Sequence, residues 1–165
     1  MSTTSGTVVR LIAVLALCVF SNCGLAPLPT GWSDAVVLSS ACDERLWGHT
    51  YFAEERLSTI HACVVVEGIV EESHRAPDGD LIIEMRVDDR LVNSANKRGL
   101  LKIEAVCQHP GSQEKHRKAC AGYPGPIFLM PRPGNQLRLT GRYVSDRDHG
   151  GHMEIHPLSL MEFLQ

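Results

Sequence analysis

The side chains best suited to chemistry are gathered near the C-terminus, in the stretch DRDHGGHMEIHP from position 146 to position 157. Imidazole and carboxylate groups are ligands for divalent transition-metal ions, and they are also the usual general acids and bases of enzymes. The stretch therefore predicts a metal site, an acid–base site or, with no chemistry, a polar strand facing solvent. Its candidate residues are Asp146, Asp148, His149, His152, Glu154 and His156.

The stretch does not match the zinc-protease motif HExxH, which needs a glutamate directly after the first histidine of a helix. Here Glu154 stands two residues after His152, and a proline follows His156. On a strand, these three side chains point to one face, with Met153 and Ile155 buried on the other. Alternate strand residues stand about 7 Å apart, whereas metal–ligand bonds are about 2 Å long, so a shared ion requires the side chains to lean together. Without an ion, the polar face is expected to meet solvent, with His156 or Glu154 bonded to a neighbouring loop.

A catalytic alternative uses the hairpin before this strand. Asp146 or Asp148 can orient His149 as a general base, because a carboxylate fixes the tautomer and direction of an imidazole. Asp78 and Asp80 belong to an earlier Asp-Gly turn. They join the same ligand surface if the fold brings the two hairpins to one side.

The alternative function is a metal-assisted hydrolase of the nuclease kind, in which Arg138 or Arg142 would contact a phosphate. General nucleic-acid binding is not expected, because lysines and arginines are scattered and the formal net charge is −3, or about −4 once Arg10 leaves with a signal peptide. Aromatic residues make up only 5% of the chain and do not interleave with basic ones. The sequence has neither a glycine-rich phosphate loop nor a GxSxG nucleophile motif. No cofactor is expected, and a divalent metal ion remains an open alternative.

The elements that must position these residues are mostly strands. β-branched runs and period-two alternation predict five of them, at 61–72, 81–87, 100–107, about 137–143 and 152–164. One short helix is expected within 113–120, between the third and fourth strands, and 89–99 is either a short helix or an open connection. Residues 41–60 read as irregular cover with a short helical turn. This order predicts an all-β, OB-like Greek-key barrel over 41–165, since a β-sandwich would need seven strands or more.

The alternation also assigns side chains to faces. In the third strand it places Leu101, Ile103 and Ala105 inward, with Lys102 and Glu104 outward. In the first strand Gly68 predicts a bulge or a bend, because glycine within a strand often marks such a position, and in the fourth strand Gly141 interrupts the alternation.

The N-terminal segment is typical of an export signal. One positive charge, Arg10, precedes the apolar run from Leu11 to Phe20, which is too short to cross a bilayer as a helix. We expect a signal peptide at 1–22, a lipid-modified Cys23 and a tether over 23–40 that is rich in proline, glycine and serine. A transmembrane helix, or soluble release by a cut after Ala26, are the alternatives. The expected location is the bacterial cell envelope, periplasmic or on the outer surface, or outside the cell, with membrane contact only through the lipid.

Four cysteines remain beyond position 23: Cys42, Cys63, Cys107 and Cys120. An even number in an exported domain implies two disulfides, of which three connectivities exist. Local pairing, Cys42–Cys63 and Cys107–Cys120, is the prediction, and closing loops of this length stabilises the fold by about 3 kcal/mol each. A four-cysteine zinc site is the alternative, although the sequence has no CxxC pair.

Several motifs together resemble a family of small, exported, largely uncharacterised bacterial proteins. The resemblance covers roughly 42–163 and rests on DGDL, LVNSAN, LLKIEAVC, ACAGY, PGNQLRLTGRYVSDRDHG and EIHP. It implies an OB-like barrel and export, and it brings no established activity. The chain departs from the family where Ile82 replaces a usual histidine, and where HGGHMEIHP replaces HGW-x-EIHP.

These features together predict an exported, disulfide-containing and lipid-anchored module of the cell envelope that binds a ligand or partner. The ligand itself, whether a small molecule or a protein, is not defined by the sequence. The ligand surface is expected at the hairpin 146–149 together with Glu154 and His156.

Overall fold

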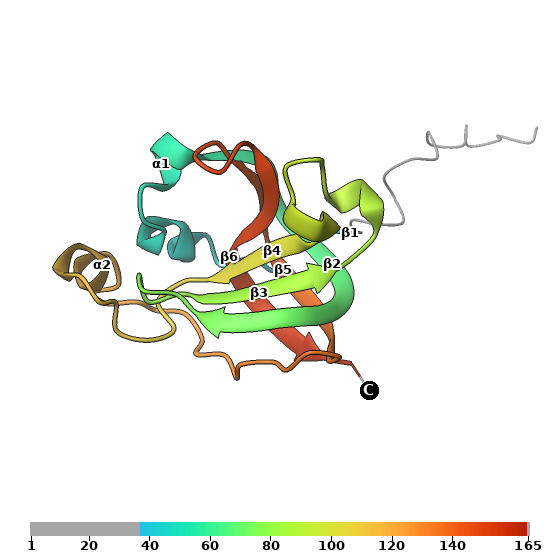
Figure 1. Ribbon diagram of the computed structural model, residues 1–165. Helices are drawn as coiled ribbons and strands as arrows, with labels where there is room; N and C mark the ends of the chain where they lie inside the picture. Colours follow the sequence, from blue (N-terminus) through green and yellow to red (C-terminus); the bar gives the residue numbers. More distant parts are fainter. Residues whose placement is uncertain (1–36, 165) are drawn as a thin grey trace, which may run out of the picture.

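The structure, a computed structural model, describes residues 37–164. Strands account for most of its regular elements, because the β-branched runs of the sequence pair edge to edge (Figure 1). In chain order the elements are β1 (Val37–Leu38), η1 (Glu44–His49), α1 (Ala53–Arg56), β2 (Leu57–Arg75), β3 (Leu81–Arg86), η2 (Asp89–Leu91), η3 (Lys97–Gly99), β4 (Leu101–Ala105), α2 (Glu114–Ala119), β5 (Gln136–Asp146) and β6 (His152–Phe163).

Five of the strands close into a ring in the order β2-β3-β4-β6-β5, with β5 pairing back onto β2. All neighbours are antiparallel except β4 and β6, which are parallel. This order, with α2 placed between β4 and β5, is the OB-like arrangement that the sequence predicts, and the all-β class is confirmed.

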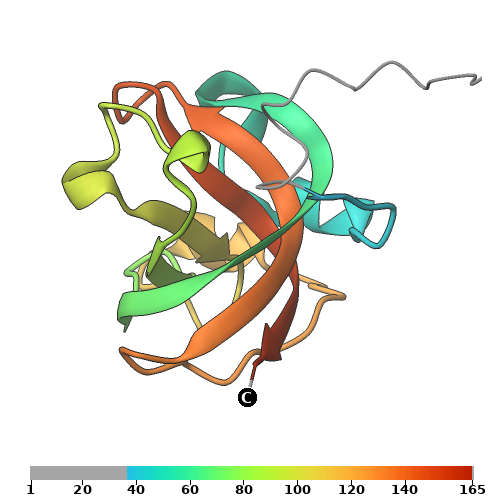
Figure 2. The same cartoon turned by 90° about the vertical axis from the view of Figure 1, so that its right-hand side faces the viewer.

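Strand β2 makes closure possible, because it is long enough to pair with two partners. It curves along the ring and joins β5 over most of its length and β3 near its end (Figure 2). Register shifts occur between Thr59 and Val64 and between Val70 and Glu72. Of the bulge or bend predicted at Gly68, the bulge does not form there, since Gly68 pairs regularly with Leu137 and the nearby register shift lies between Val70 and Glu72. Glycine is needed there because an added Cβ would lie 2.5 Å from the carbonyl oxygen of Arg86.

The core lies inside the ring and is built by the alternation read from the sequence. Leu101, Ile103 and Ala105 are fully buried, as predicted. Gly141 interrupts the pairing of β5 with β6, also as predicted: an added Cβ would lie 2.4 Å from Cγ2 of Ile155.

Two disulfides fix the ends of elements and confirm the predicted pairing. Cys42–Cys63 fastens the segment before η1 to β2, and Cys107–Cys120 joins the chain after β4 to the end of α2. The four-cysteine zinc alternative is thereby wrong, because all four sulfurs are consumed in S–S bonds. Disulfides persist in oxidising compartments, which indicates an extracytoplasmic environment.

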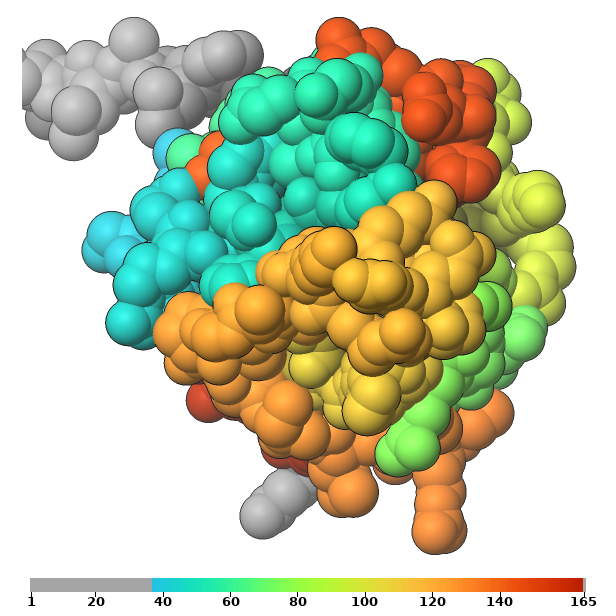
Figure 3. Space-filling view, turned by 90° about the vertical axis from the view of Figure 1, so that its left-hand side faces the viewer, coloured from blue at the N-terminus to red at the C-terminus, as the bar shows by residue number. Residues whose placement is uncertain are grey.

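The segments without long strands cover one face of the ring (Figure 3). There η1 and α1 lie against the chain around α2, which forms where a short helix was predicted. Nδ1 of His49 lies 2.8 Å from the carbonyl oxygen of Ala119, and the rings of Tyr51 and His116 meet edge to face at 5.1 Å.

Among the described residues, no helix has the length and apolarity to span a bilayer. The predicted signal peptide and Cys23 lie outside them. The predicted tether overlaps them only at its end, where Val37 and Leu38 pair with β2.

Candidate functional site

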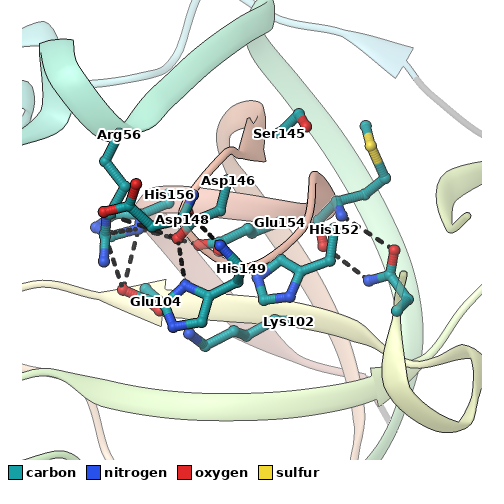
Figure 4. A network of polar contacts seen from close by, with 12 residues as sticks. Arg56, Lys102, Glu104, Ser145, Asp146, Asp148, His149, His152, Glu154 and His156 are labelled. Atoms are coloured by element: carbon teal, nitrogen blue, oxygen red, sulfur yellow. Dashed lines mark hydrogen bonds and ion pairs between the residues drawn. The ribbon is translucent and has the colours of Figure 1, made fainter.

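The predicted ligand residues converge on the outer side of β4 and β6, next to the β5–β6 hairpin (Figure 4). The hairpin takes its shape from Asp146, the last residue of β5. Oδ1 of this buried carboxylate accepts hydrogen bonds from the backbone N–H groups of Asp148, at 2.9 Å, and of His149, at 3.3 Å. Gly150 and Gly151 follow with φ of +75° and +82°, a conformation that favours glycine. These two glycines therefore help to turn the hairpin back toward β6.

The second oxygen of Asp146 orients His149. Oδ2 lies 2.9 Å from Nδ1 of the imidazole, so the proton of a neutral ring is placed on Nδ1 and the lone pair on Nε2. Of the two aspartates proposed for this role, Asp146 is the one whose carboxylate contacts the ring of His149. The backbone N–H of Asp148 donates to the carboxylate of Asp146. The side chain of His149 is 54% exposed, which leaves its ring accessible from solvent.

The three alternate residues of β6 lie on one face, as predicted, and Glu154 connects the two histidines. Its Oε1 lies 2.5 Å from Nε2 of His152, and its Oε2 lies 3.1 Å from Nδ1 of His156. The expectation of a solvent-facing strand is wrong, because Glu154 and His156 are at most 1% exposed. The cause is that β4, Arg56 and the hairpin cover this face, while the core covers the other.

Glu104 completes the network. It lies on the outer face of β4, as predicted, but this face is covered rather than open to solvent. It is 3% exposed. Its Oε2 lies 3.0 Å from Nδ1 of His156, its Oε1 is paired with Nζ of Lys102, and Nη2 of Arg56 is 3.8 Å away. Arg56, Lys102 and Glu104 were all missed. The signal that could have found them is the parallel pairing of β4 with β6, which sets Lys102 beside Glu154.

His156 is an imidazolium held between two carboxylates. Burial by itself lowers its pKa, but the charges of Glu104 and Glu154 outweigh burial and raise the pKa to about 10. Burial likewise raises the pKa of Glu104, yet His156 and Lys102 bring it down to about 2. The pKa of Glu154 is held well below its usual range by hydrogen bonds to His152 and His156. Nη2 of Arg56 lies 3.4 Å from Nδ1 of His156. Both groups are cations, so this is a contact between like charges, and the N–H at Nδ1 donates to the carboxylates of Glu104 and Glu154.

Opposite charges are paired within the network. Three cations, Arg56, Lys102 and His156, face three carboxylates, which are Glu104, Asp146 and Glu154. Buried charges are tolerated when each has opposite partners and hydrogen bonds. Two buried atoms of the network, Nε2 of His156 and Nε of Arg56, have no hydrogen-bond partner among the residues that the structure describes.

A cavity of about 610 Å³ opens beside the network. His149 and His152 form part of its wall, together with Arg56, Lys102 and Glu104. The first hairpin also reaches it through Asp78, so the two hairpins do converge. In an OB-like order this is the face of the second and third strands, flanked by the loops after the first and fourth, where such folds usually bind ligands.

Other predicted residues do not line the cavity. Asp80 is buried beside Glu104 and His156, and its Oδ1 accepts a hydrogen bond of 2.8 Å from the backbone N–H of Cys107. Arg138 pairs with Glu67, and Arg142 lies over the ring of Trp47, 4.4 Å from its centre. Neither arginine is part of the cavity wall. A phosphate bound in this cavity would therefore not be contacted by either arginine from the cavity wall.

Four of the predicted residues are placed to hold a metal ion. Asp146, His149, His152 and Glu154 each offer one ligand atom, and these atoms all lie within 4.8 Å of one another. The rings of the two histidines are stacked, with their centres 5.4 Å apart. A second group, Asp80, Glu104 and His156, meets the same distance test. Its imidazole is the protonated one, so the second group is poorly suited to an ion.

Comparison with protein-family models, curated proteins and solved structures finds no match for this chain. What the site can do follows from its own donor atoms, charges and access to solvent.

Proposed function

We propose that this chain is an exported binding module that holds a divalent transition-metal ion between Asp146, His149, His152 and Glu154. The proposal is carried by one observation, the approach of four ligand atoms within 4.8 Å at the wall of an open cavity. Two imidazole nitrogens and two carboxylate oxygens are a donor set that suits zinc and its neighbours. Bonds of about 2.0 to 2.2 Å to one ion require the four side chains to rearrange around it. The atoms of the hydrogen-bonded pairs would move apart, and the more distant atoms would move closer.

The burial of the four ligands is graded in a way that suits entry of an ion. Asp146 and Glu154 are fully buried, His152 is 14% exposed, and His149 is 54% exposed. The carboxylates are therefore fixed in advance, and the imidazoles stand at the opening. An ion approaching from the cavity meets the histidines first.

The network behind the ligands supplies their orientation. Oε2 of Glu154 is hydrogen-bonded to His156, which leaves Oε1 as the oxygen directed at His152. Outer partners of this kind set the direction and basicity of metal ligands. An ion bound at the histidine nitrogens that join His149 to Asp146 and His152 to Glu154 replaces these hydrogen bonds. Each ligating nitrogen must present a lone pair, so a proton on it has to move to the other ring nitrogen or to solvent.

Export is part of the proposal. Both disulfides and the apolar run at Leu11–Phe20 support it. A lipid on Cys23 would hold the module at a membrane of the cell envelope, and the ion would be taken up outside the cytoplasm.

The first prediction is that the metal raises thermal stability. Protein stripped with chelator and titrated with Zn²⁺, Co²⁺ or Ni²⁺ should bind one ion by calorimetry. At 100 times Kd, binding stabilises the folded state by about 2.7 kcal/mol, or on the order of 10 °C in Tm for a domain of this size. The double variant His149→Ala, His152→Ala should lose this shift.

The matched control is His74→Ala, which removes an imidazole from the wall of the same cavity outside the four ligands. It should keep the full shift in Tm. The proposal is overturned if no divalent transition metal shifts Tm, or if His74→Ala and the double variant lose the shift equally.

A metal-assisted hydrolase is the second candidate. It is favoured by the size of the cavity, which lies in the range of small-molecule sites, and by His149, whose ring Asp146 orients. Metal-loaded protein offered bis(p-nitrophenyl) phosphate should release nitrophenolate if this is correct. If the protein binds the metal but does not hydrolyse this substrate, the hydrolase candidate is rejected and the proposed binding module stands.

A further inference from the structure

We propose that the metal-loaded cavity binds a small phosphate-type oxyanion, held by the ion together with Lys102 and Arg56. This inference rests on the proposed metal site and names the ligand class that the site would take. Its basis is the charge of the cavity wall and the position of the two basic side chains.

The charge balance changes when an ion enters. Without an ion, the wall already holds two cationic side chains, Arg56 and Lys102, beside the ligand residues His149 and His152. A divalent ion adds two further positive charges at that wall. A bound ion is often the largest local charge of a site, and its excess is neutralised by what binds next to it.

The remaining charged groups of the wall do not supply that neutralisation. Asp78 and Lys97 both line the cavity and offset each other in charge. Glu84 is already paired with Arg98. Glu104 lies between His156 and Lys102, which satisfy its two oxygens. The excess charge is therefore left for a ligand from solvent.

Two donors are placed to receive such a ligand. Lys102, on β4, and Arg56, at the end of α1, both approach Glu104 next to the two histidines (Figure 4). Both line the cavity, with side chains 23% and 18% exposed. Nε of Arg56 is buried and has no hydrogen-bond partner among the described residues, although Asp146 lies 3.6 Å away. A guanidinium with an unused donor suits the planar, bidentate binding of an oxyanion.

The ion and the anion should therefore bind cooperatively. An anion that contacts the metal increases the affinity of the protein for the metal, and the metal increases the affinity for the anion by the same factor. Inorganic phosphate should bind to the loaded protein at least 10-fold more tightly than to the metal-free protein.

Co²⁺ provides a direct test, because its visible absorption reports its ligands. Protein loaded with one equivalent of Co²⁺, free of excess ion, is titrated with inorganic phosphate, phenyl phosphate and acetate, and binding is followed by absorption and calorimetry. We expect the spectrum to change with phosphate and Kd to weaken at least 10-fold for Lys102→Met, while Co²⁺ affinity stays within about 3-fold. Lys102→Arg should restore phosphate binding, which guards against a variant that simply unfolds. Tighter binding of phenyl phosphate than of phosphate would identify a phosphate monoester as the ligand.

Two results overturn the inference. Normal Co²⁺ binding with equal phosphate affinity in loaded and metal-free protein, or with none in either, removes the anion site and leaves the proposed function intact. Failure of Co²⁺ to bind at all removes the proposed function, and this inference with it.

Discussion

His156 is the residue around which the buried charges are arranged. One nitrogen, Nδ1, lies 3.0 Å from Glu104 and 3.1 Å from Glu154. The two glutamates come from β4 and β6, so their common partner joins two strands that meet only through parallel pairing. A cation between two carboxylates also prevents their repulsion, which would otherwise expel one of them into solvent. His156 thus fixes one oxygen of each glutamate and leaves the other free to face Lys102 or His152.

Asp80 carries the clearest pH dependence. Burial, with the charges of Asp78 and Glu104, raises its pKa to about 7, against the opposing charge of His156. A folded-state pKa above the unfolded value of 3.8 means that the stability linked to its proton is lost as pH rises from about 4 through 7. Asp80→Asn removes this pH-dependent contribution to stability, because asparagine does not titrate. By urea unfolding with disulfides intact, its stability relative to the wild type should rise by roughly 2 kcal/mol from pH 5 to pH 8. An equal difference at both pH values would contradict the assignment.

At the scale of elements, strand β6 explains both the success and the failure of the sequence prediction. Alternation correctly placed His152, Glu154 and His156 on one face and Ile155 in the core. It could not show that the polar face is covered too. The polar face is covered by α1 and β4. These elements lie far from β6 along the chain, so the local sequence pattern of β6 does not reveal that they cover it.

The same reasoning explains what was predicted elsewhere. Local patterns sufficed for the five strands, the short helix and the disulfide pairing, because each depends on neighbours in sequence. No bulge forms at Gly68, because the glycine there allows a close approach to Arg86 instead. Glu104 was placed on the outer face, but its burial was not predicted, because the sequence alone did not identify β4 as the partner of β6.

Gly141 offers a test of packing between β5 and β6. A Cβ at this position would lie 2.4 Å from Cγ2 of Ile155 and 2.7 Å from the carbonyl oxygen of Pro157. Gly141→Ala should therefore lower the free energy of unfolding by about 1 to 3 kcal/mol, the usual cost of overpacking. Gly48→Ala, where a Cβ meets nothing within 4 Å, is the control and should change stability by less than about 0.5 kcal/mol. Equal effects in urea unfolding would show that this contact is relieved without cost.

At the scale of the whole molecule, the ring and its covering segments separate two regions. The core inside the ring is apolar, while the ionisable network lies outside β4 and β6 beneath α1 and the β5–β6 hairpin. The two disulfides hold the covering segments in place, since one joins the start of η1 to β2 and the other joins α2 to the end of β4. An oxidising compartment therefore stabilises the cover of the site as well as the fold.

The lipid anchor is tested on the full-length chain. If Cys23 is acylated, the protein expressed in a bacterial host should partition into the detergent phase of Triton X-114. Cys23→Ala should move it to the aqueous phase, because one acyl-modified residue is then the main membrane contact. Identical partitioning of the two proteins would refute lipidation.

Closure of the ring by β6 sets the order in which the molecule can form its site. Arg56, Glu104 and Glu154 are far apart in the chain and meet only when the last strand pairs with both β4 and β5. Folds dominated by such distant pairings form in milliseconds to seconds, after the intervening loops have closed. A nascent or unfolded chain in transit has the ligands but not their arrangement. On the proposed function, the protein would cross the membrane empty and take its ion from the compartment in which it folds.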